Sequence, residues 1–187
     1  MAQKRKDWNG LISGFKASDL VFLDESGCNT DMTRRYAYSL GGSRAVDSAP
    51  LSKPKNTTIL PSIQLDGTLR YTTFSGGTTV ERFKRYLETD LLPHLNGNSV
   101  LIMDNMKSHH AKAVRNLLDS SGVRYIYLPP YSPDLNPIEK LWSKVKSFLR
   151  KFKARTLDAL PNAIQNAFHS VTISDCSGWF RFCGYAL

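Results

Sequence analysis

Two aspartates follow short apolar segments of equal length. Asp24 comes directly after residues 20–23, and Asp104 comes directly after residues 100–103. Such short apolar runs are typical of strands buried on both faces. A carboxylate at the end of a buried strand is costly unless its charge is compensated. Each Asp could simply cap its strand or begin a turn, but two matched ones favour a shared cation site.

The chemistry of this pair indicates a divalent metal ion. If the Asp24 and Asp104 carboxylates meet, their repulsion raises the pKa of one of them unless a cation lies between them. The neighbouring residues Glu25 and Asn105 provide no positive charge. Mg²⁺ is the natural candidate, because it prefers hard oxygen ligands and needs only a few carboxylates.

Glu139 is the third candidate acid. Asn136 is a good helix N-cap and Pro137 suits the first helical position, so a long helix is predicted to begin here. The apolar residues of this helix recur at helical spacing: Ile138, Leu141, Trp142, Val145, Phe148, Leu149 and Phe152. Glu139 lies at the margin of that face and could reach the sheet edge as a metal ligand. It could equally fold back onto the Asn136 N–H as a cap.

The elements that must position these acids form a mixed α/β pattern. Further strands are predicted at residues 36–40, 57–65, 69–74 and 123–128. Further helices are predicted from Thr78, over residues 111–119, and from about Thr156 and Ser174. Asp66-Gly67 indicates a two-residue hairpin, Glu81 completes a capping box with Thr78, and Gly122 suits a left-handed helix end. The apolar runs that precede Asp24 and Asp104 are predicted to be adjacent strands in the centre of the sheet. Both carboxylates would then lie at the edge formed by the strand ends, where open α/β folds commonly bind ligands.

The predicted long helix carries a stretch of unbalanced positive charge. Between residues 140 and 155 there are seven basic residues and no acidic one. They are Lys140, Lys144, Lys146, Arg150, Lys151, Lys153 and Arg155. A basic stripe beside an acidic site suits DNA phosphates, although a solvated helix face is the alternative.

Composition agrees with a single intracellular domain. Its basic charge favours a polyanionic partner, either nucleic acid or an anionic membrane surface, although a generic basic protein is the alternative. The 187 residues carry 25 Lys and Arg against 16 Asp and Glu, a net charge of +9. Three cysteines, Cys28, Cys176 and Cys183, show no paired spacing and suggest free thiols. We see neither a signal peptide nor an apolar run of membrane-spanning length, so we expect a cytoplasmic protein.

Three segments, in order, resemble the signature blocks of transposases related to the mariner group. The first is Leu-Asp-Glu-Ser-Gly at residues 23–27, and the second is Asp104-Asn105 with His109. The third is Leu-Pro-Pro-Tyr-Ser-Pro-Asp-Leu-Asn-Pro-Ile-Glu at residues 128–139. Between Asp104 and Glu139 lie 34 residues, a spacing typical of the bacterial insertion-sequence branch.

This resemblance implies a ribonuclease-H-like fold, a mixed sheet flanked by helices. It also implies that Asp24, Asp104 and Glu139 are an acidic triad that holds two Mg²⁺ ions, with Mn²⁺ able to substitute. Two such ions stabilise the attacking and leaving oxygens of an in-line displacement. The expected activity is metal-dependent cleavage and joining of DNA.

Three further residues are candidates for supporting roles. His109, with Asn105 close by, could contact a bound phosphate or support a metal-ligating acid, although a lone histidine at a helix start is as often a cap or a surface residue. Asn136 and the Pro-Tyr-Ser-Pro segment before it are expected to aim Glu139.

The resemblance also implies DNA and protein partners, and a helix-turn-helix region that this sequence does not contain. Substrates of this group are double-stranded DNA, namely the terminal inverted repeats of the element and a target that is usually TA, and its members generally act as dimers. They normally begin with a helix-turn-helix region, for which residues 1–23 leave no room. We therefore expect residues 1–17 to be a linker or remnant and residues 18–187 to be the catalytic domain, with the helix-turn-helix region on an upstream protein or reading frame.

Two other functions compete with an active transposase domain. One is a catalytically silent remnant that binds DNA or partner subunits as a regulator. The other is a ribonuclease H or repair nuclease of the same fold, which the Pro-rich block before Glu139 disfavours. A nucleotide-binding loop and a serine nucleophile elbow are both absent from the sequence.

Overall fold

A computed structural model of the chain describes residues 2–34, 36–48, 50–51 and 54–185. Among them, six strands form one mixed sheet: β1 (Leu20–Leu23), β2 (Ser26–Cys28), β3 (Thr57–Ile63), β4 (Leu69–Ser75), β5 (Val100–Met103) and β6 (Arg124–Tyr127). The order is β2-β3-β1-β5-β6, with β4 paired to β3. β1, β5 and β6 run parallel, whereas β3 is antiparallel to its neighbours.

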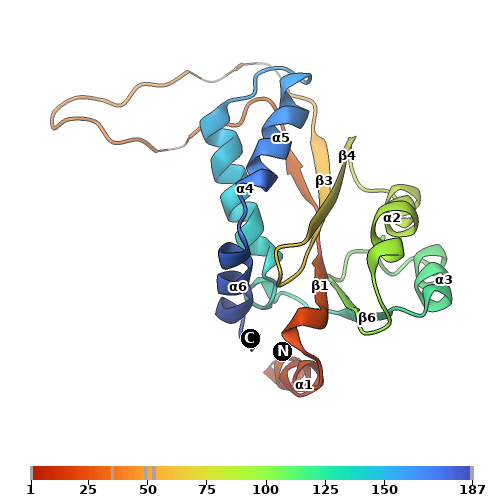
Figure 1. Ribbon diagram of the computed structural model, residues 1–187. Coiled ribbons are helices and arrows are strands. Elements are labelled where there is room, and N and C mark those ends of the chain that lie inside the picture. Colours follow the sequence, from red (N-terminus) through yellow and green to blue (C-terminus); the bar gives the residue numbers. More distant parts are fainter. Residues whose placement is uncertain (1, 35, 49, 52–53, 186–187) are drawn as a thin grey trace.

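Helices cover both faces of this sheet, as the sequence predicted (Figure 1). They are α1 (Ala2–Ile12), α2 (Val80–Tyr86), α3 (Lys112–Ser121), α4 (Ile138–Phe152), α5 (Ala159–His169) and α6 (Ile173–Phe182). Figure 1 shows α4, α5 and α6 on one side and α2 and α3 on the other. None of the described helices is long and apolar enough to cross a membrane.

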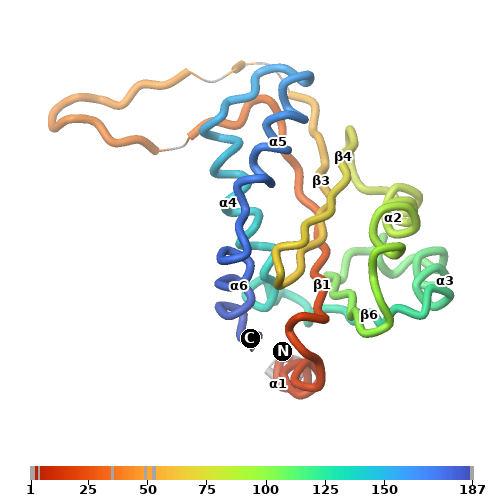
Figure 2. The backbone as a smooth tube through the Cα atoms, viewed as in Figure 1, coloured from red at the N-terminus to blue at the C-terminus, as the bar shows by residue number. Residues whose placement is uncertain are grey.

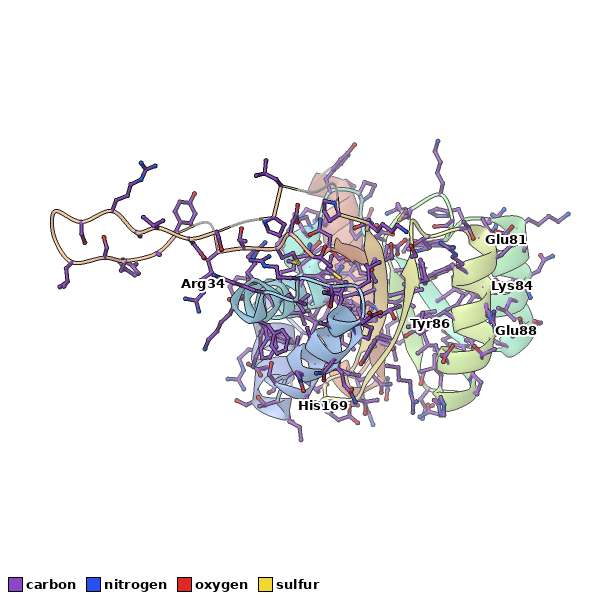
Figure 3. All side chains as sticks on the ribbon, turned by 90° about the horizontal axis from the view of Figure 1, so that it is seen from above. Arg34, Glu81, Lys84, Tyr86, Glu88 and His169 are labelled. Atoms are coloured by element: carbon purple, nitrogen blue, oxygen red, sulfur yellow. The ribbon has the colours of Figure 1, made fainter. Side chains whose placement is uncertain are left out.

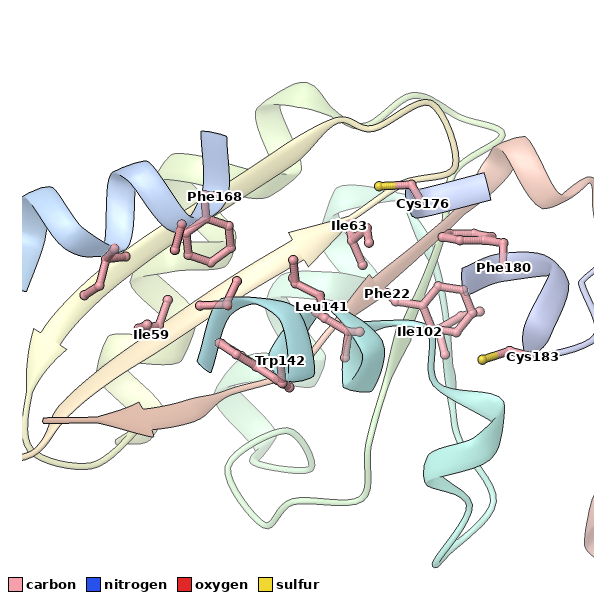
Figure 4. Close-up of a cluster of buried hydrophobic side chains, with 14 of the residues drawn as sticks. Phe22, Ile59, Ile63, Ile102, Leu141, Trp142, Phe168, Cys176, Phe180 and Cys183 are labelled. Atoms are coloured by element: carbon pink, nitrogen blue, oxygen red, sulfur yellow. The ribbon is translucent and has the colours of Figure 1, made fainter. Parts of the chain in front are cut away.

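The alternation of side chains along β1 explains why both faces need helices. Phe22 points into the cluster shared with α4 and α6, where its ring meets Phe180 edge-on with 5.3 Å between centroids (Figure 4). Leu23 points into the opposite cluster, against Phe83 of α2 and Leu118 of α3. Because an apolar cluster covers each face of the sheet, β1 is buried along its whole length, as its continuous apolar sequence predicted.

One face of α2 anchors it to the sheet. Tyr86 points towards the strands (Figure 3), and its hydroxyl donates to the Arg70 carbonyl at 3.0 Å. Glu81, Lys84 and Glu88 lie on the outer side of the same segment (Figure 3). The amphipathic pattern predicted from Thr78 is thus real, but the cap is one residue later, because Thr79 accepts the Arg82 N–H.

Two predictions about the chain around β3 are wrong: the length of the hairpin loop after β3, and a strand at residues 36–40 before it. The loop between β3 and β4 covers residues 64–68, not two residues, because Ile63 pairs with Leu69 and the Gln64 N–H donates to the Thr68 carbonyl. Residues 36–40 form no strand: they belong to a segment that extends away from the body between β2 and β3 (Figure 2). Tyr38 is 106% exposed there, so the alternating pattern finds no partner strand among the described residues.

The N-terminal residues are more ordered than the sequence suggested. Residues 2–12 form α1 where a linker was predicted. Trp8 anchors this helix, because it is 4% exposed and belongs to the same apolar cluster as Tyr185 near the C-terminus. Arg5 adds an ion pair with Asp134 in the loop before α4.

Candidate active site

The two aspartates are neighbours because their strands are parallel and in register. Leu20 pairs with Val100 and Phe22 with Ile102, so Asp24 and Asp104 each follow their strand at the same level. Neighbouring strands lie about 4.8 Å apart. The sheet edge therefore brings together two carboxylates that are 80 positions apart in the chain, as predicted.

The start of α4 brings the third acid to this edge. The helix begins at Ile138, one residue later than predicted, with Pro137 at the cap position, while the extended Asn136 accepts the Ile138 N–H through its side-chain oxygen at 3.4 Å. The Asn136 amide also donates to Asp24 Oδ2 at 3.5 Å. This contact ties the helix start to β1 and places the exposed Glu139 beside the aspartates.

The three acids line one cavity of about 680 Å³. Its floor is the end of β1 and β5, and one wall is the first turns of α4 with Trp142 and Lys146. The opposite wall is the Pro-rich segment of residues 128–133. The predicted juxtaposition of Asp24, Asp104 and Glu139 is therefore present.

The two aspartates have opposite electrostatic environments. Burial, and then the charges of Asp104, Glu139 and Glu25, raise the pKa of Asp24 to about 7, although the Glu25 N–H donates to it. Burial also raises the pKa of Asp104, but hydrogen bonds from the His109 ring and the Met106 N–H outweigh it and hold that pKa below its ordinary range. Asp24 thus lies among acids without a nearby positive charge that would offset its burial.

His109 lies behind the acids and not in the cavity. Its ring is fully buried, with Nδ1 2.8 Å from Asp104 Oδ1 and Nε2 3.1 Å from Glu25 Oε2. Burial lowers its pKa, but the two carboxylates outweigh burial and raise it to about 9. Direct contact with a bound phosphate, one of the two roles considered for His109, is therefore excluded, because no part of the ring is accessible.

Asn105 has a structural contact in addition to its place in the cavity lining. Its amide donates to the Leu128 carbonyl at the end of β6. This bond joins the loop after β5 to the start of the Pro-rich wall, so Asn105 supports the shape of the cavity.

The predicted DNA-binding residues of α4 lie in two places. Lys140, Lys144 and Lys151 line one hollow beside Asp175 and Trp179 of α6, whereas Lys146 lines the cavity of the three acids. In the hollow, Lys144 pairs with Asp175, which offsets part of its positive charge. Arg150 lines a neighbouring hollow with Lys151, beside the segment that follows β2.

Comparison with known proteins identifies the family. The sequence profile described as DDE superfamily endonuclease matches residues 19–161. The chain belongs to this family. It is similar to the transposable element Tc1 transposase of Caenorhabditis elegans, with 30% identity over 97 residues, which is 50% of this chain and 36% of that protein. The chain therefore spans about a third of the length of that relative.

Solved structures show that this DDE domain has a ribonuclease-H-like fold. It is similar to the Mos1 transposase paired-end complex with left transposon end, with a TM-score of 0.80 and 19% identity over 95% of this chain and 57% of that one. It is also similar to the catalytic domain of Mos1 mariner transposase, with a TM-score of 0.73 and 17% identity over 96% and 85% of the two chains.

The carboxylate oxygens of Asp24, Asp104 and Glu139 suit divalent ions that bind together with a substrate. Among the residues that the structure describes, no three His, Cys, Asp or Glu side chains are close enough to hold an ion by themselves. Mg²⁺, however, is usually held by one or two carboxylates, waters and substrate phosphates. Burial and the neighbouring acids raise the pKa of Asp24 to about 7, and a bound cation would favour its ionised form.

Sequence reasoning missed two residues that line this cavity. Glu25 lines the cavity and contacts His109, although in the sequence it was only an extra charge beside Asp24. Trp142 was assigned to the apolar face, yet it also lines the cavity. The only sequence signal for Glu25 was its place in the first signature block.

Proposed function

We propose that this chain is the catalytic part of a transposase of the Tc1/mariner type, which cuts and joins DNA with the help of divalent metal ions. The observation that carries the proposal is the convergence of Asp24, Asp104 and Glu139 on one cavity, where the pKa of Asp24 is raised to about 7. A triad of this kind is electrostatically favourable only with bound cations.

Each residue of the site has a distinct role in this proposal. Asp24, Asp104 and Glu139 would hold two Mg²⁺ or Mn²⁺ ions. When bound, such ions stabilise the attacking and leaving oxygens of an in-line displacement at phosphorus. Asn136 orients Asp24 and the start of α4 through its 3.5 Å contact, and no side chain needs to form a covalent bond to the substrate.

The charges around the cavity agree with a DNA substrate. Lys146 lines it directly, and Arg150 lies one helical turn further along α4. Positive side chains next to an acidic site can neutralise phosphates on either side of the cleaved bond. The Mos1 relatives were solved as paired-end complexes with a transposon end, and we infer transposon ends and target DNA as substrates here, with a homodimer and an upstream helix-turn-helix region as partners.

The direct test is cleavage of supercoiled plasmid by the full chain with Mg²⁺ or Mn²⁺. Asp104→Asn and Glu139→Gln keep the size of the side chains and remove one metal ligand each. We expect both to lose more activity than the roughly 10- to 100-fold typical of a supporting residue, with unchanged thermal unfolding. Asp158→Asn, on an exposed position, is the matched control.

Two outcomes would contradict the proposal in different ways. Full activity of both variants would show that the triad assignment is wrong. A wild-type chain that binds DNA but cleaves none with either ion would instead support a catalytically silent DNA-binding remnant.

A further inference from the structure

Glu25 is a buried acid that the metal-binding triad does not include. It follows Asp24 directly at the end of β1, and its side chain is only 9% exposed. One carboxylate oxygen, Oε2, lies 3.1 Å from His109 Nε2, while Oε1 is buried without a hydrogen-bond partner among the described residues. Burial of a polar side chain is costly unless its atoms find partners, so the contact between Glu25 and His109 calls for an explanation.

His109 connects Glu25 to the second acid of the triad. Its other ring nitrogen, Nδ1, lies 2.8 Å from Asp104 Oδ1, and the ring stacks on Phe83 with 4.3 Å between centroids. The ring therefore bridges the two carboxyl groups, with one nitrogen in contact with each.

The bridge fixes the orientation of the Asp104 carboxylate. Oδ1 accepts from the His109 ring and from the Met106 N–H at 3.0 Å. Both contacts use the same oxygen, which leaves Oδ2 available to a ligand. Without the ring contact, only the Met106 N–H would hold this side chain, which is 42% exposed.

The bridge also spans two strands. Glu25 follows β1 and Asp104 follows β5, and His109 lies on the loop before α3, packed under α2 by Phe83. A side chain that is held from both sides and stacked has no freedom to follow Asp104 if it moves. The position of Asp104 after β5 therefore depends, through His109, on the position of Glu25 after β1.

We propose that Glu25 is a positioning residue that acts through His109 to hold Asp104 in the orientation needed for metal binding. The inference rests on the proposed function, because it assigns Asp104 as a metal ligand. It differs from a direct role for Glu25 as a further ligand, which its free Oε1 would also permit.

The test measures binding of Mn²⁺ alone to the full chain, by electron paramagnetic resonance of the unbound ion without DNA. Glu25→Gln keeps the size and removes the charge, whereas Glu25→Asp keeps the charge but is too short to reach His109. We expect each to weaken Mn²⁺ binding by about 10-fold or more, the effect typical of a residue that orients a metal ligand. Glu88→Gln, on the outer side of the segment after α2 (Figure 3), is the matched control and should bind as the wild type does.

A double-mutant cycle separates the two roles of Glu25. In His109→Asn the shorter amide can still donate to Asp104 but no longer reaches Glu25. If Glu25 acts through the ring, adding Glu25→Gln to this variant changes Mn²⁺ affinity by less than about twofold. An equal loss in both backgrounds would overturn the positioning role in favour of direct ligation.

Failure of this inference is distinguishable from failure of the proposed function. If the wild type binds Mn²⁺, Asp104→Asn does not, and both Glu25 variants bind normally while unfolding at the wild-type temperature, only the role of Glu25 is refuted. If Asp104→Asn binds Mn²⁺ like the wild type, the triad itself is refuted.

Discussion

Asp24→Asn should make the metal-free protein more stable while it removes metal binding. In the folded chain the pKa of Asp24 is about 7, against an ordinary value of 3.8, chiefly because of burial and then because of the nearby acids. An amide of the same size carries no charge to bury and no repulsion from Asp104 or Glu139. If Asp24 holds a cation as proposed, stability at this position is given up for metal binding.

The size and pH dependence of the effect follow from that pKa. A rise from 3.8 to about 7 corresponds to about 4 kcal/mol at most, and partial exposure of the carboxylate reduces the expectation to roughly 2 kcal/mol. Between these two pH values the unfolded chain has released the proton and the folded chain retains it, so wild-type stability falls as pH rises. The advantage of Asp24→Asn is therefore fully present above pH 7 and disappears near pH 4.

Urea unfolding in EDTA at pH 5 and pH 8 measures this difference. At pH 8 we expect a higher free energy of unfolding for Asp24→Asn than for the wild type, with the gap smaller at pH 5. Mn²⁺ should stabilise the wild type through binding to the folded state but leave the variant unchanged. Asp158→Asn, at an exposed helix start, should show none of these effects.

The reasoning would be refuted by a variant that is less stable than the wild type at pH 8 in EDTA. That result would mean that Asp24 is stabilising as a carboxylate without a metal, and that the cavity already contains its compensating charge.

Two further predictions concern the N-terminal helix and the DNA surface. Trp8→Ala should lower the free energy of unfolding by about 3 kcal/mol, because it removes the buried anchor of α1; a loss below 1 kcal/mol in urea titration would show that α1 is not docked in solution. Lys146→Gln should weaken DNA binding and reduce by about one the slope of log affinity against log salt, measured by fluorescence anisotropy, whereas Lys112→Gln on the exposed side of α3 should leave the slope unchanged.

Local sequence signals predicted the elements of the core well. The apolar runs before Asp24 and Asp104 are β1 and β5, because a strand buried on both faces cannot alternate. Gly122, with φ of 71°, ends α3 as a left-handed cap. These features depend on residues within one or two turns of each other, so a local pattern is sufficient to specify them.

Predictions failed where distant residues decide the structure. The alternation of residues 36–40 resembles a strand, but pairing needs a neighbouring edge, and this exposed segment has none among the residues that the structure describes. The polar composition of residues 2–12 did not predict a docked helix. Trp8 of α1 is buried in the same cluster as Tyr185, which lies at the other end of the chain. Neither partner is visible from the local pattern.

The sequence by itself determined the three acids, the order of the strands and helices around them, and the positive charge of α4. Only the tertiary structure decided how these parts work together. It placed His109 between Glu25 and Asp104, contacts that span 84 and 5 positions of the chain. It also turned Lys144 towards Asp175 and left Lys146 at the cavity. The physical reason is that helical periodicity fixes which residues share a face, whereas the charge that each one meets depends on which element packs against that face.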